Sequence, residues 1–131
     1  QRLPVPKSNR IGQTVINPWN GKDLFQISAD IGDLHFADDH LYILERNSFE
    51  VAKWDPVTSK IVARVSFWAS AKDLYETGEP FGLAEALFVD KDAIWIGFDN
   101  NANPLTHQAQ RKFGVAGNFG TIARFRRPKS F

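Results

Sequence analysis

The sequence predicts an all-β chain, and three observations support this fold class. Apolar residues occur in short runs bounded by turn-forming residues, one run alternates strictly, and several runs recur in the same order. The runs are rich in Val, Ile, Phe, Trp and Tyr and are too short for typical helices, which favours strands. The nine expected strands are Thr14–Ile16, Asp23–Ile27, Ile31–Ala37, Leu41–Glu45, Phe49–Trp54, Ile61–Phe67, Ala86–Asp90, Ala93–Phe98 and Thr121–Arg126.

Alternation within two of these runs predicts which side chains face a core. The run over residues 61–67 alternates strictly, as expected for a half-buried antiparallel strand. Its apolar face consists of Ile61, Ala63, Val65 and Phe67. In the last run, Arg124 and Arg126 are expected on the solvent side, opposite Ala123 and Phe125. Residues 69–76 fit either a short helix or an irregular loop.

Recurring segments are the most informative feature of the chain. Asn17-Pro18 opens a turn between two expected strands, and Asp55-Pro56 does the same 38 residues later. Asn or Asp followed by Pro is typical of the start of a tight turn. Three further pairs of segments recur in the same order, namely residues 33–36 with 85–88, residues 41–43 with 94–96, and residues 51–56 with 122–128.

A repeat of four short strands about every 40–50 residues is typical of a β-propeller blade. We therefore expect an irregular arm over residues 1–13 and a partial β-propeller over residues 14–131. Residues 14–28 would form the outer strands of one blade, residues 31–68 a full blade, and residues 82–126 a last blade without its outer strand. Known propellers close with at least about four blades, so further blades from another chain or a second copy are expected. A nine-stranded sandwich or barrel is the alternative.

Composition limits the classes of function. A chain of 131 residues with 43% hydrophobic and 24% charged residues is typical of one globular domain. A formal net charge of +1 argues against a nucleic-acid partner. A cluster of four cations near the end does not change this expectation, because the net charge is balanced elsewhere; it consists of Arg124, Arg126, Arg127 and Lys129. No apolar run approaches the roughly 20 residues of a membrane span. The absence of Cys excludes thiolate chemistry, and a start at Gln1 with no Met suggests a processed or excised product.

Polar residues are predicted to gather at one mouth of the central channel. The start of an inner strand and the end of the next strand lie at the same end of an antiparallel hairpin. Asp33 is therefore expected near residues 45–47, and Glu85 near residues 99–101. The long stretch over residues 101–120 leaves from that end as well.

Glu85, Asp99, Asn100 and Asn101 form the candidate metal site. Carboxylate and amide oxygens are hard ligands that suit calcium better than a softer metal. The competing interpretation is a turn, because Asp and Asn side chains also cap their own backbone.

Arg46 and His107 are the other candidate functional residues. Arg46 follows Glu45 at a strand end, where it would bind an anionic substrate or form a salt bridge that joins neighbouring blades. His107 is the histidine best placed as a general acid or base. No nucleophile elbow, phosphate-cradling loop or His-Glu-x-x-His motif occurs. Five aromatic residues are expected in the core between blades rather than on a sugar-stacking surface, namely Phe36, Trp54, Trp68, Phe88 and Trp95.

Three motifs resemble the esterase-like phytase family of β-propellers, which is related in architecture to gluconolactonase-type six-bladed propellers. They are Leu41-Tyr42-Ile43-Leu44-Glu45-Arg46, Gly82-Leu83-Ala84-Glu85 and Ile94-Trp95-Ile96-Gly97-Phe98-Asp99-Asn100-Asn101. The resemblance covers residues 31–126 and implies the C-terminal part of such a domain. The Glu-Gly pair of that family is Glu85-Ala86 here, which allows less backbone freedom beside the expected ligand.

The resemblance implies a secreted or periplasmic hydrolase of phosphate or carboxylic esters. Glu85 and Asp99 would hold a calcium ion, Asn100 and Asn101 would assist, and Arg46 would orient an anionic ester. From a different class, the chain would be a non-catalytic propeller module that binds a ligand or a protein partner at the same mouth. The lack of a recognisable nucleophile–base pair favours this second function.

Overall fold

The structure is a computed structural model that describes residues 15–16, 23–24, 30–77 and 83–131. It confirms the all-β class. The expected arm over residues 1–13 lies outside the described residues, as does most of the segment 14–28. Within that segment, β1 (Val15–Ile16) pairs with β2 (Asp23–Leu24) in antiparallel fashion.

The first large sheet is an antiparallel meander of four strands in the order β3-β4-β5-β6. The 3-10 helix η1 (Arg46–Ser48) lies between β4 and β5. The expected Asp-Pro turn is confirmed, because the Asp55 carboxylate accepts hydrogen bonds from the Val57 amide at 2.8 Å and the Thr58 hydroxyl at 2.7 Å. The strands are β3 (Ile31–Ala37), β4 (His40–Glu45), β5 (Glu50–Asp55) and β6 (Lys60–Ser66).

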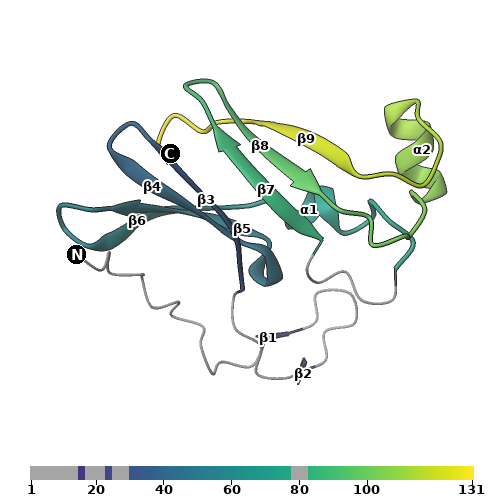
Figure 1. Cartoon of the computed structure of the whole chain (residues 1–131), viewed down its shortest axis with the longest axis horizontal. Coiled ribbons are helices and arrows are strands. Elements are labelled where there is room, and N and C mark those ends of the chain that lie inside the picture. Colours follow the sequence, from purple (N-terminus) through teal and green to yellow (C-terminus); the bar gives the residue numbers. More distant parts are fainter. Residues whose placement is uncertain (1–14, 17–22, 25–29, 78–82) are drawn as a thin grey trace.

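The second sheet is an antiparallel meander of three strands in the order β7-β8-β9. Its strands are β7 (Ala84–Val89), β8 (Ala93–Phe98) and β9 (Thr121–Arg126). Figure 1 shows the two sheets lying against each other, with their strands crossing at an angle. Neither sheet closes on itself, so the chain has the architecture of a partial β-propeller, with one four-stranded and one three-stranded blade.

Two helices occupy the connections. α1 (Trp68–Ala71) is shorter than the helix considered for residues 69–76. α2 (His107–Phe113) lies within the stretch that the sequence analysis treated as a loop. The Thr106 hydroxyl caps α2 by accepting a hydrogen bond from the Ala109 amide at 3.1 Å, and Gly114 ends it with a φ of 67°.

Strand pairing shows how the two blades correspond. Leu41 pairs with Trp54 in the first sheet, and Ile94 pairs with Phe125 in the second, as the recurring segments predict. β3 and β7 each contain a β-bulge after their first residue. The bulged positions are Gly32 and Glu85, which therefore correspond to each other. The predicted correspondence of residues 33–36 with residues 85–88 is wrong by one position, because Asp33 corresponds to Ala86. The turn at residues 17–22 lies outside the described residues.

The main core lies between the two sheets. It includes Tyr42, Leu44 and Val51 from the first sheet and Leu87 and Ile96 from the second. Phe67 contacts Phe98 edge to face across it, with ring centroids 5.9 Å apart.

Some aromatic residues are not where the sequence analysis expected them. Trp54 is buried, but in a separate small cluster on the other face of the first sheet. Phe36 and Phe88 are exposed, so the prediction that they belong to the core is wrong. The expected aromatic core is therefore only partly formed, and Phe88 instead packs edge to face against His35 of β3, with ring centroids 4.8 Å apart.

A third β-bulge, between β5 and β6, corrects the predicted face of β6. Ala63 and Val65 pack against the main core as expected, whereas Ile61 packs in the small cluster on the opposite face. The cause is the bulge, because Lys53 pairs with Ala63 while the next residue, Trp54, pairs with Ile61. One residue of β6 is thereby skipped, and the alternation changes face at that point.

Candidate functional site

The mouth end of the two sheets brings Arg46 and Glu85 together. The Arg46 guanidinium forms an ion pair with Glu85 of the second sheet and donates from Nε to Asp30 Oδ2 at 2.7 Å. The hydrogen bond to Asp30 raises the pKa of Arg46 above its ordinary value. Of the two roles considered for Arg46, the structure displays the salt bridge between blades.

Close approach of the backbones positions this ion pair. A Cβ atom at Gly32 would lie 2.6 Å from the Ala84 carbonyl oxygen and 3.3 Å from the Arg46 side chain. Only glycine therefore lets the start of β3 lie this close to β7. One residue further on, the Asp33 carboxylate accepts a hydrogen bond from the Leu87 amide at 2.8 Å, which adds a second polar link between the sheets.

Glu45 and Arg46 are neighbours in sequence but have different partners. Glu45 is buried and forms an ion pair with Arg64 of β6, which also contacts Glu50 at 3.1 Å. Hydrogen bonds and ion pairs to the two glutamates outweigh the effect of burial and raise the pKa of Arg64. Glu45 thus stabilises the first sheet internally, whereas Arg46 links it to the second.

Asp99, Asn100 and Asn101 follow β8 and form a turn. Asp99 Oδ1 accepts a hydrogen bond from the Asn101 amide at 3.2 Å, and Asn101 has a φ of 44°. The Asn100 side-chain amide is buried and donates to the Asn103 carbonyl at 3.1 Å and to Asn118. These contacts are the turn interactions that the sequence analysis weighed against a metal site.

Glu85 is therefore directed to Arg46, and the other three candidate ligands are engaged in the turn. Across the described part of the chain, no group of three or more His, Asp or Glu side chains is placed to hold a metal ion. Calcium binding remains a prediction of the resemblance.

His107 lies at the start of α2 and is exposed. No hydrogen bond joins its imidazole to another described residue.

The opposite end of the sheets holds a pocket that the sequence analysis missed. This basic pocket has a volume of about 700 Å³ and is open to solvent. The sequence shows the four cations near the end of the chain. It does not show that three other segments lie beside them in the folded chain. The charged lining residues are Asp38, Lys53, Lys91, Asp92, Arg124, Arg126, Arg127 and Lys129.

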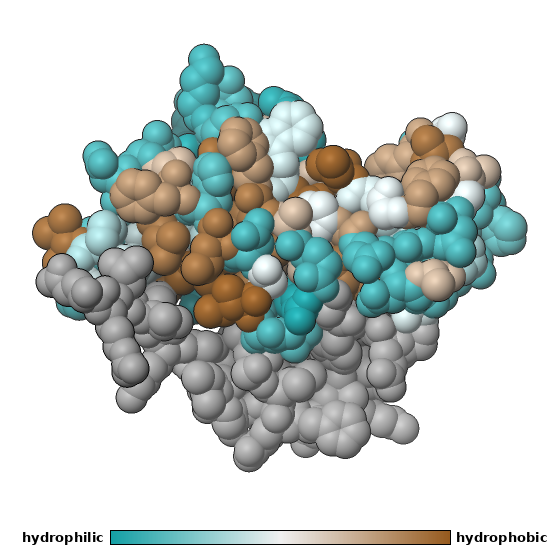
Figure 2. Space-filling model, in the orientation of Figure 1, coloured by the Kyte–Doolittle hydropathy of each residue, from teal (hydrophilic) through white to brown (hydrophobic). Residues whose placement is uncertain are grey.

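An apolar groove of about 640 Å³ lies between β9 and the two helices. It is lined by Leu74, Phe98, Phe113, Phe119 and Phe125, among others. Figure 2 shows apolar surface around α2 and over the strands of the first sheet, with hydrophilic surface between them.

Comparisons with protein-family models, with curated proteins and with solved structures found no match for this chain. Among the helices that the structure describes, none has the length and apolar character of a membrane span.

Proposed function

We propose that the chain is a non-catalytic β-propeller module that assembles with further blades of the same construction and binds a ligand or protein partner at the channel mouth. One observation carries the proposal. Several positions that are buried between the two sheets are exposed where they recur on the outward faces, namely at Leu34, Phe36 and Ile122. On the outward face of the first sheet, Ile43 and Trp54 are already buried in the small cluster.

The outward face of the second sheet corresponds to the buried face of the first. We define it by Phe88 and Ile122. Ile122 occupies the position of Val51, yet Ile122 is 76% exposed and Val51 is 0% exposed. Burying an isoleucine of this kind is worth about 2 kcal/mol, so this face gains from a neighbouring blade.

The outward face of the first sheet shows the reciprocal pattern. We define it by Leu34 and Phe36, which correspond in the strand ladder to Leu87 and Val89. Leu34 and Phe36 are 51% and 63% exposed, whereas Leu87 and Val89 are 6% and 2% exposed. The exposed positions on the two outward faces therefore match positions that are buried in the interface that already joins the two sheets.

A second copy of the chain supplies the matching half. The outward face of the second sheet in one copy would pack on the outward face of the first sheet in the next. Such head-to-tail contacts form rings when the rotation between copies closes. Patches of contiguous apolar surface are typical of interaction sites in proteins of this size.

Light scattering on a sizing column, over a range of protein concentrations, tests this function. We expect the native mass to exceed that of one chain and to rise with concentration. Ile122→Lys and Leu34→Lys should each lower it to the mass of a monomer, because each places a charge in the interface. Val57→Lys is the matched control, since Val57 is 90% exposed in the Asp55 turn. A wild-type monomer at every concentration would contradict the proposal.

A calcium-assisted ester hydrolase is the second candidate function. The Glu85 carboxylate at the mouth supports it, because that side chain is partly exposed and lies beside a cation that would orient an anionic ester. A cation held by Glu85 and Asp99 would polarise the ester oxygen or activate water. Asn100 and Asn101 would assist in holding the cation, and Arg46 would orient the anionic ester.

Calcium titration by calorimetry, combined with a screen of simple phosphate and carboxylic esters, separates the two functions. In the hydrolase, Glu85→Gln should abolish both calcium binding and turnover, whereas Arg46→Gln should retain calcium binding because it frees the carboxylate. Unchanged calcium affinity and turnover in Glu85→Gln would contradict the hydrolase. Calcium binding without turnover supports the module.

A further inference from the structure

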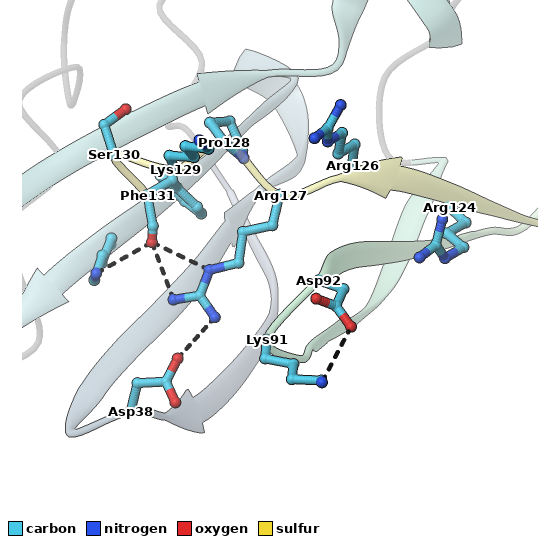
Figure 3. A pocket seen from close by; sticks show the side chains of 11 residues that line it. Asp38, Lys91, Asp92, Arg124, Arg126, Arg127, Pro128, Lys129, Ser130 and Phe131 are labelled. Carbon is cyan, nitrogen blue, oxygen red and sulfur yellow. Dashed lines mark hydrogen bonds and ion pairs between the residues drawn. The ribbon is translucent and has the colours of Figure 1, made fainter.

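The basic pocket lies at the end of the sheets opposite to the Arg46–Glu85 ion pair. Its walls come from the β3–β4 turn, β5, the β7–β8 turn, the end of β9 and the residues that follow it (Figure 3). Six of its lining residues are Lys or Arg, and two are Asp. The formal net charge of the whole chain is only +1, so positive charge is concentrated here.

Arg127 forms the fixed centre of the pocket. Its Nη1 donates to Asp38 at 2.7 Å and to the Asp90 carbonyl at 2.8 Å, and its Nη2 donates to the Tyr42 hydroxyl at 2.6 Å. Its Nε and Nη2 also donate to the Phe131 carbonyl oxygen, at 3.2 and 3.0 Å. Figure 3 shows the guanidinium between Asp38 and Phe131. Arg127 is therefore a positioning residue that holds the end of β9 against the first sheet.

The carboxylates near the pocket already have partners. Asp38 is paired with Arg127, and Asp92 lies 3.7 Å from the Lys91 ammonium. Asp90, just outside the pocket, accepts hydrogen bonds from the Trp95 ring at 2.9 Å and from two amides of its own turn. None of these carboxylates forms an ion pair with the remaining cations.

Four cations form no direct ion pair with a carboxylate side chain among the residues that the structure describes, although Arg124 interacts electrostatically with Asp90. The Lys53 ammonium donates to the main-chain oxygen of Phe131 at 3.1 Å, and the Arg124 guanidinium lies 5.4 Å from the centre of the Trp95 ring. Arg126 and Lys129 form no ion pair with a described residue. An arginine stacked on an aromatic ring is partly fixed in place before any ligand arrives.

We infer that the basic pocket binds a small multivalent oxyanion, meaning a ligand with two or more phosphate or carboxylate groups. Guanidinium groups bind both kinds of oxyanion through paired, charge-assisted hydrogen bonds. Several unpaired cations around one open pocket favour a ligand with several charges over a single ion. The site is separate from the mouth.

Calorimetric titration of the full chain at low salt tests the inference, with tripolyphosphate, citrate and orthophosphate as probes. We expect saturable binding of one tripolyphosphate, at least about tenfold tighter than orthophosphate, because more charge-assisted hydrogen bonds form. Affinity should fall as salt is raised. Citrate weaker than tripolyphosphate identifies phosphate as the preferred group, and equal affinity identifies a general oxyanion site. The absence of saturable binding, or equal affinity for orthophosphate, overturns the inference.

A pair of charge-matched variants distinguishes a defined pocket from diffuse attraction. Arg124→Gln with Arg126→Gln removes two cations from the pocket and should weaken tripolyphosphate binding about tenfold or more. Arg111→Gln with Lys112→Gln removes the same charge from α2, outside the pocket, and should change it by less than about twofold. Circular dichroism checks that both variants fold. An equal loss in the two variants would show non-specific attraction and overturn the proposal.

Discussion

The two sheets have the same pattern of strand pairing, but at the mouth end they carry different kinds of residue at one corresponding position. Glu45 ends β4 in the first sheet, and Phe98 occupies the corresponding position at the end of β8; both are buried. Glu45 is tolerated there because Arg64 reaches it from the fourth strand, β6. The second sheet has no fourth strand among its described residues, and an apolar side chain stands in place of the carboxylate.

This difference shows that each sheet is adapted to the number of strands it contains. A buried carboxylate requires a cation, since removal from water disfavours its charge. A phenylalanine at the same position requires only apolar neighbours, which the first sheet supplies through Phe67. The outward faces differ in this respect. Both carry exposed apolar residues of the kind that are buried between the two sheets.

Breaking the Glu45–Arg64 pair is expected to have the largest effect. Arg64→Ala leaves a buried carboxylate without a cation and should lower the free energy of unfolding by about 3–5 kcal/mol. Urea denaturation followed by circular dichroism measures it. Adding Glu45→Gln to the same chain should recover part of the loss, because the amide carries no charge. A loss below about 1 kcal/mol in Arg64→Ala would show that Glu45 is well solvated.

A methyl group at Gly32 tests the close approach of the sheets. Gly32→Ala places Cβ against the Ala84 carbonyl and should cost about 2 kcal/mol of stability, since backbone must move. Gly97, within the second sheet, is the matched control. Its added Cβ would lie 3.0 Å from the Ala86 side chain, and Gly97→Ala should cost less than about 1 kcal/mol. Equal costs in a thermal or urea unfolding experiment would contradict the assigned role of Gly32.

The ion pair between the blades is expected to contribute less. Arg46→Gln removes the contacts to Asp30 and Glu85, which are partly exposed, and should lower stability by about 1 kcal/mol at low salt. At about 1 M salt the difference from wild type should shrink, because salt screens exposed charges. A difference that does not change with salt would indicate lost packing instead of lost charge.

One turn in each sheet contains an aspartate that is expected to make the stability of the chain depend on pH in acid. Hydrogen bonds from the Trp95 ring and the Asp92 amide hold the pKa of Asp90 below its ordinary value of 3.8, and the Thr58 hydroxyl does the same for Asp55. A depressed folded-state pKa adds stability above pH 3.8, and this stability is lost as the pH falls through the lower folded value. Asp90→Asn and Asp55→Asn should each flatten the fall in melting temperature below about pH 4. NMR titration of the two carboxylates checks the direction.

Local signals made much of the fold predictable. Short β-rich runs marked the strands of both sheets, and their recurrence matched the ladder positions of β4, β5, β8 and β9 but was wrong by one position for β3 and β7. The Asp55 turn followed from its Asp-Pro start. Helix α2 was missed although Thr106 and Gly114, a typical cap and stop, flank it, because the stretch carries no apolar period that favours a helix. Ile61 was misplaced because a β-bulge changes the face of a strand without any change in composition.

The candidate site was harder to predict because it depends on how the sheets stack. The Arg46–Glu85 contact joins residues 39 positions apart in different blades. Sequence spacing predicted that both residues lie at the mouth. It did not show whether each would bind a ligand or the other side chain. The basic pocket combines four segments of the chain, and only the cluster of cations at the end of β9 and just after it was visible in the sequence.

The central claim is that the two outward faces are matching halves of one interface, and a mixture of two variants tests it most directly. Ile122→Lys retains only the outward face of the first sheet, and Leu34→Lys retains only that of the second. Each variant alone should have the native mass of one chain by light scattering, and an equimolar mixture should contain dimers and no larger species. A mixture that remains monomeric, beside a wild type that assembles, would contradict the account.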